Sequence, residues 1–168
     1  RKQGFGTLVI SSPATLSGNL EVGQDAGGTT GGFVRANGGA VVLRDGGTLL
    51  NSSVLIGYGS AFQLDNSGVG LVDRLNDAAI MDLAGGSLVL AGKAGQTVGE
   101  AMGQLRLRNN TSSSQVQAIL PTGGAANWRF ASYGIEDVNA GSNFQFVGRG
   151  ADIGPTSQNR IAFTSLPT

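Results

Sequence analysis

The segment Gly85-Gly86-Ser87-Leu88-Val89-Leu90-Ala91-Gly92 consists of a glycine pair, a short apolar run and a closing glycine. Its Gly-Ser-Leu is a near copy of Gly6-Thr7-Leu8 and Gly47-Thr48-Leu49, and the successive offsets are 41 (47 − 6) and 39 (86 − 47) residues. Shorter echoes at Gly18-Asn19-Leu20 and Gly39-Ala40-Val41 reduce the period to about 20 residues. A period of that size is typical of one coil of a β-solenoid, so the sequence predicts an all-β stack of about eight coils.

The apolar runs between the glycines have the period of β-strands. Phe62-Gln63-Leu64-Asp65, Leu105-Arg106-Leu107-Arg108 and Trp128-Arg129-Phe130 alternate apolar with polar residues. Successive side chains of a strand point to opposite faces, so each run predicts a strand with one buried face. Only 71–79 has helical spacing, and nine residues between strands predict a single helical turn or a shaped corner at most.

The composition excludes several classes of function. The chain has 168 residues, of which 29 are glycine, with no net charge, no cysteine and no histidine. It therefore lacks disulfides, cysteine-based metal sites and the commonest general base. The balanced charge argues against a nucleic-acid partner, and no apolar run is long enough to insert in a membrane. We expect no catalysis and no cofactor.

The chain divides into two parts by the regularity of its pattern. Residues 1–124 keep the glycine rhythm, whereas residues 125–168 are less regular and richer in aromatic residues. We interpret the second part as an irregular continuation or cap of the same stack.

Two neighbouring segments resemble a known repeat. Residues 73–92 read as an Arg-Leu-x-Asp-Ala-Ala corner followed by Leu-x-Gly-Gly-Ser-Leu-x-Leu-x-Gly, and 96–107 add Thr-Val-Gly and a further Gly-x-Leu-x-Leu. This order of elements resembles the autotransporter-associated β-strand repeat. The resemblance implies a right-handed parallel β-helix, exported and displayed on a bacterial cell surface within a long repetitive protein. It implies no catalytic residues.

These observations favour a structural or adhesive role. A stack of parallel strands leaves an unpaired strand edge at each end, which adjacent repeats or another copy of the chain would cover. We expect this sequence to be a piece of a longer extracellular chain. Its expected partners are copies of itself, adjacent repeats and, as a further option, surface glycans.

The alternative is a carbohydrate-active or carbohydrate-binding β-helix with Asp73, Asp77 and Asp82 in its groove. Paired carboxylates can serve as general acid and base when they face each other across a substrate groove. The competing interpretation is that Asp73, Asn76 and Asp77 cap a turn by accepting hydrogen bonds from its backbone.

A calcium site is a weaker candidate. Asp25, Asp45 and Asp65 recur every 20 residues, so they would line one edge of three coils. Calcium prefers several converging oxygen ligands. The competing interpretation is a turn residue repeated with the coil.

A contact surface for a glycan or partner is the last candidate. Arg106 and Arg108 alternate with leucines and so face the same way, and Trp128 and Tyr133 could stack on sugars. The competing interpretations are a solvated strand face and, for Trp128, a place in the core. Other arginines that could join such a surface are Arg44, Arg74 and Arg129.

Overall fold

The computed structural model describes residues 5–15, 20–22, 38–50, 53–108, 113–119, 123–136, 143–154 and 157–165. These residues form an all-β structure of two six-stranded parallel sheets. The first sheet has, in spatial order, β1 (Thr7–Ile10), β3 (Ala40–Arg44), β5 (Ala61–Asp65), β7 (Ser87–Ala91), β9 (Ser113–Ile119) and β11 (Asn143–Arg149). The second has β2 (Leu20–Val22), β4 (Ser53–Gly57), β6 (Ile80–Ala84), β8 (Thr97–Arg108), β10 (Ala125–Glu136) and β12 (Asn159–Phe163).

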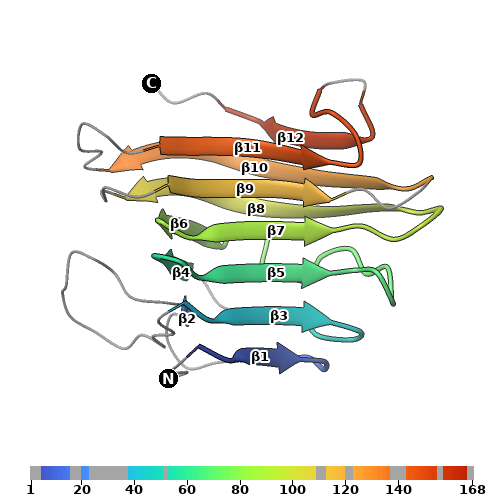
Figure 1. Ribbon diagram of the computed structural model, residues 1–168, viewed down its shortest axis with the longest axis horizontal. Coiled ribbons are helices and arrows are strands. Elements are labelled where there is room, and N and C mark those ends of the chain that lie inside the picture. Colours follow the sequence, from blue (N-terminus) through green and yellow to red (C-terminus); the bar gives the residue numbers. More distant parts are fainter. Residues whose placement is uncertain are drawn as a thin grey trace.

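The chain alternates between the two sheets, so the strands stack in chain order (Figure 1). We call each odd-numbered strand, together with the even-numbered strand that follows it, a level. The level of β1 and β2 lies at one end of the stack, and the level of β11 and β12 lies at the other (Figure 1). No helix of the described residues is long and apolar enough to cross a membrane.

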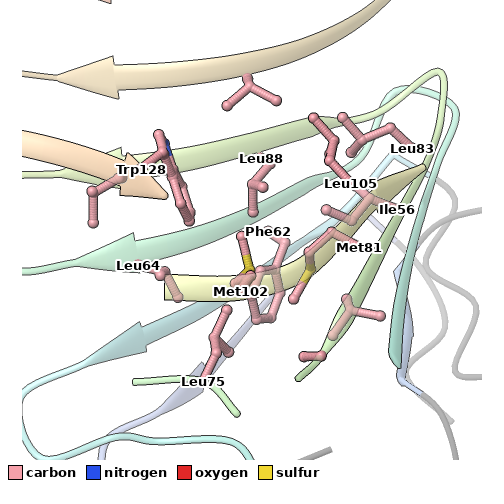
Figure 2. Packing of buried hydrophobic residues seen from close by; sticks show 14 of the residues in the cluster. Ile56, Phe62, Leu64, Leu75, Met81, Leu83, Leu88, Met102, Leu105 and Trp128 are labelled. Carbon is pink, nitrogen blue, oxygen red and sulfur yellow. The ribbon is translucent and has the colours of Figure 1, made fainter. Parts of the chain in front are cut away.

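The core lies between the sheets, as the alternating runs predicted. Parallel register places Val41, Phe62, Leu88 and Val116 in one inward row. Met81 and Leu105 face Phe62 and Leu88 of that row from the second sheet (Figure 2). All six residues are buried. Because inward and outward residues alternate along every strand, parallel register brings apolar side chains of neighbouring levels into contact. Each level therefore buries apolar surface against the next.

The predicted period of about 20 residues is too short. Stacked partners are separated by 21 residues from Ala40 to Ala61 and by 34 residues from Leu20 to Val54. The reason is that similar tripeptides occupy different edges of the stack. Gly6 and Gly86 directly precede β1 and β7 in one sheet, whereas Leu49 forms isolated parallel bridges with Ala14 and Leu75. The described residues form six levels in place of the expected eight.

Residues 71–79 form a shaped corner without helix. The carbonyl of Arg74 accepts a hydrogen bond from the Leu49 nitrogen of the level below at 2.7 Å. Asn76 Oδ1 accepts from the Ala78 nitrogen at 2.9 Å, which is the capping role predicted for this residue. The backbone of this corner therefore hydrogen-bonds to the level below. Residues 71–79 do not form the helical turn that the spacing of their apolar residues allows.

Both sheets continue past residue 125, the boundary expected from the pattern. β10 pairs with β8 from Ala125–Thr97 to Glu136–Arg108, and β11 pairs with β9. The aromatic residues of this part stack on one another, with ring centroids 5.8 Å apart for Trp128 and Phe130 and 5.3 Å apart for Phe130 and Phe163.

Candidate functional site

A buried arginine fastens the corner at 71–79. Arg74 is fully buried, and its Nε donates to Asn66 Oδ1 at 2.8 Å. One terminal nitrogen donates to the Gly47 carbonyl at 2.6 Å, and the other donates to the carbonyls of Val69 at 3.0 Å and Asp65 at 3.3 Å. Arg74 thus joins three segments, and it is not part of the arginine surface suggested by the sequence.

Glu100 completes this corner from the level above. It is 3% exposed, and its two carboxylate oxygens accept hydrogen bonds from the backbone nitrogens of Arg74 at 2.8 Å and Leu75 at 2.9 Å. Burial raises the pKa of Glu100 to about 7; these two hydrogen bonds oppose the rise, and the nearby charges of Asp73 and Asp77 add to it. The pairing of β8 with β6 begins only at Leu105. At Arg74 and Leu75, the Glu100 carboxylate therefore accepts the backbone hydrogen bonds that a paired strand would otherwise accept.

Two adjoining surface pockets lie along β10, the first at this corner and the second toward β12. The first has a volume of about 260 Å³ and the second about 470 Å³, and the two share Asn127 and Arg129. We call them together the β10 groove. The remaining lining residues are Val72, Asp73, Gly99, Glu100 and Ala101 in the first part, and Trp128, Gly154, Arg160, Ile161 and Ala162 in the second.

The strand register explains the polar character of the groove. Asn127 aligns with Gly99 on one side and Arg160 on the other, and Arg129 aligns with Ala101. Arg129 and Arg160 are exposed and form no ion pair with any described residue, while Asn127 Oδ1 is buried and accepts no hydrogen bond within the described chain. The groove therefore presents two guanidinium groups that pair with no described acidic residue, and acidic residues (Asp73 and Glu100) line only its first part.

The three predicted carboxylates do not share this groove. Asp73 lines it, and Asp77 is exposed on the turn at the same corner. Asp82 on β6 is 3% exposed and forms an ion pair with Arg106, with Nε–Oδ1 and terminal nitrogen–Oδ2 distances of 2.7 and 2.8 Å. An acid–base pair that includes Asp82 would first have to break this bidentate contact.

The residues predicted to contact a glycan or partner do not form one exposed surface among the described side chains. Arg106 is the partner of Asp82, so one of the two alternating arginines is engaged within the sheet. Trp128 is 1% exposed, and its Nε1 donates to the Gln117 carbonyl of the opposite sheet at 2.9 Å, so its ring belongs to the core. The backbones of Arg108 and Tyr133 lie in β8 and β10, but their side chains lie outside what the structure describes.

The two calcium candidates that the structure describes are each engaged by a neighbouring residue. Asp45 pairs with Arg44 at 3.5 Å, and Asp65 Oδ1 accepts from the nitrogen and hydroxyl of Ser67 at 3.0 and 2.6 Å. Asp25 lies outside the described residues. Within the described part of the chain, no group of three or more acidic, histidine or cysteine side chains could hold a metal ion.

Sequence reasoning missed Glu100, Asn127 and Arg160. Glu100 had a signal, because it falls between Val98 and Met102 at an inward position of an alternating run, where a charge requires a partner. Asn127 and Arg160 come together only through the register of β10 with β12, which the sequence does not specify. No known protein family, curated protein or solved structure matches this chain.

Proposed function

We propose that this chain is a non-catalytic structural or adhesive segment of a β-solenoid, part of an extended fibre on a bacterial surface or outside the cell. The observation that carries this proposal is the pair of parallel ladders that continues through every level. In such a stack each level is bonded to its neighbours, and stability adds along the axis. That architecture suits a rod that holds a shape over a long distance.

The proposed hand of the stack is right-handed, which makes it a right-handed parallel β-helix. Connections between parallel strands are right-handed in nearly all proteins, because a twisted strand returns to its sheet with that hand. The surface location is supported by the resemblance of residues 73–92 to the autotransporter-associated repeat.

The two ends of the stack supply the proposed contacts with adjacent repeats or another copy. Among the described strands, β1 and β11 are the outer strands of one sheet, and β2 and β12 are those of the other. At the β11 end Phe146 is 44% exposed although its row partner Val116 is fully buried. A further level would bury this ring, which makes end-to-end stacking favourable.

Sedimentation and electron microscopy test the self-association. We expect the chain to form longer particles as its concentration rises, and Phe146→Lys to suppress them. Tyr58→Lys is the matched control, because Tyr58 is an exposed aromatic residue between β4 and β5, away from both ends of the stack. Circular dichroism confirms that each variant is folded. A chain that stays monomeric at high concentration, or equal suppression by both variants, would contradict end-to-end stacking.

The carbohydrate-active alternative has less support, because Asp82 is engaged with Arg106. We expect no release of reducing ends from a panel of neutral and acidic glycans. Turnover that is lost in Asp77→Ala would overturn the non-catalytic proposal.

A further inference from the structure

We propose that the β10 groove binds an acidic polysaccharide, with Arg129 and Arg160 contacting carboxylates of the sugar chain. This goes beyond the structural role, because a rod can form without any ligand. It also uses a different residue set from the one that the sequence suggested.

The positive groups of the groove have the spacing to hold a chain with repeated charges. Arg160 on β12 is paired with Asn127 on β10. Arg129 is paired with Ala162, which lies two residues after Arg160. Two residues along a strand and one strand across correspond to roughly 8 Å between the two backbone positions. Guanidinium groups bind carboxylates with two parallel hydrogen bonds, so each arginine can hold one acidic group.

The rest of the groove leaves room for a sugar chain. Gly99 and Ala101 on the β8 side have little or no side chain, which leaves room for a sugar ring to approach the sheet.

A sugar chain fits these features better than an acidic peptide does. Asn127 and Arg129 lie on β10, which is paired with a strand on both sides, so a peptide could not add to the sheet at these positions. In many peptide complexes, apolar anchors in pockets also contribute much of the affinity. The side chain of Trp128 faces the core, and the larger aliphatic residues of the lining are Val72 and Ile161.

Calorimetric titration with a galacturonate hexasaccharide tests the proposal. We expect binding that weakens with added salt, and an affinity about tenfold lower for Arg129→Gln and for Arg160→Gln, since each removes one charged contact. Arg44→Gln is the matched control. It removes the same charge from an exposed arginine on the other sheet.

Two further ligands test whether binding requires both the acidic groups and the sugar chain. A neutral glucose hexasaccharide and hexaglutamate should both bind at least about tenfold more weakly than the acidic glycan. The proposal is overturned if the galacturonate does not bind, if the neutral glycan or the peptide binds equally well, or if Arg44→Gln weakens binding as much as the groove variants. Unchanged thermal unfolding of the two groove variants shows that the loss of affinity is local.

Discussion

The carboxylate of Glu100 binds the backbone nitrogen of Arg74 and not its guanidinium. Oε2 lies 2.8 Å from that nitrogen, while the guanidinium donates to Gly47, Asn66, Asp65 and Val69. Both residues are almost completely buried. Glu100 therefore holds the corner at 71–79 to the level above, and Arg74 holds the same corner to Gly47 and to residues 65–69. The two charged side chains do not hydrogen-bond to each other.

The stability of the fold is expected to fall as the pH rises from about 5 to about 8. The folded-state pKa of Glu100 is about 7 against an ordinary value of 4.5, so between these values the folded protein retains a proton that the unfolded chain has released. Stability then decreases with pH through this interval and levels off above the folded-state pKa. The raised pKa corresponds to a loss of roughly 2–3 kcal/mol, to be measured by urea denaturation.

Glu100→Gln isolates this effect from other titrations. The glutamine keeps one acceptor oxygen but cannot ionise, so the fall in unfolding free energy between the same two pH values should be smaller by roughly 2–3 kcal/mol. An identical pH dependence of the variant and the native chain would show that Glu100 does not titrate in this range.

Arg74→Lys is expected to destabilise the fold by about 2–4 kcal/mol, although it preserves the charge. A lysine has no planar fork to reach Asn66 Oδ1 and the carbonyls of Gly47 and Val69 together, so buried acceptors lose their donors. Arg44→Lys is the control, because Arg44 is exposed and should change the unfolding free energy by less than about 0.5 kcal/mol. Equal midpoints of urea unfolding for the two variants would contradict this role of Arg74.

The sequence predicted those features that depend on residues close together along the chain. Alternation predicted the strands and their inward residues, because the face of a side chain follows directly from its position in a strand. The length of a level was not predictable in this way. Gly47 and Gly86 begin similar tripeptides but lie at different edges of the stack, and only the register shows which glycines are equivalent.

The same limit applies to the candidate site. Glu100 meets Leu75 across 25 residues of sequence, and Arg160 meets Asn127 through pairing of β10 with β12. Asp73, Asp77 and Asp82 are close in sequence, but Asp82 on β6 points to Arg106 on β8. Proximity along the chain was therefore a poor guide to which polar groups share a surface.

Removing one member of the Asp82–Arg106 pair should cost more than removing both. Arg106→Leu leaves the Asp82 carboxylate buried without its guanidinium, with an expected loss of about 3 kcal/mol. The double variant Asp82→Leu/Arg106→Leu places two leucines next to Leu55, the register partner of Asp82, and should lie within about 1 kcal/mol of the native chain. Thermal unfolding of the single and double variants gives the coupling, and additive losses would contradict it.

The glycine pair at 85–86 lies directly before β7, in close contact with the level below. Gly85 has φ of +88°, and a Cβ on Gly86 would lie 2.7 Å from the Gly57 carbonyl oxygen and 2.8 Å from that of Ile56. These atoms belong to the backbone of the level below and cannot move without breaking the ladder, so Gly86→Ala should lose about 2–3 kcal/mol. Gly46→Ala is the matched control, since its Cβ would meet only the Ser11 carbonyl oxygen at 3.4 Å. Its unfolding free energy should change by less than about 0.5 kcal/mol. If urea unfolding shows the same stability for both variants, close contact between levels does not explain why a glycine occupies position 86.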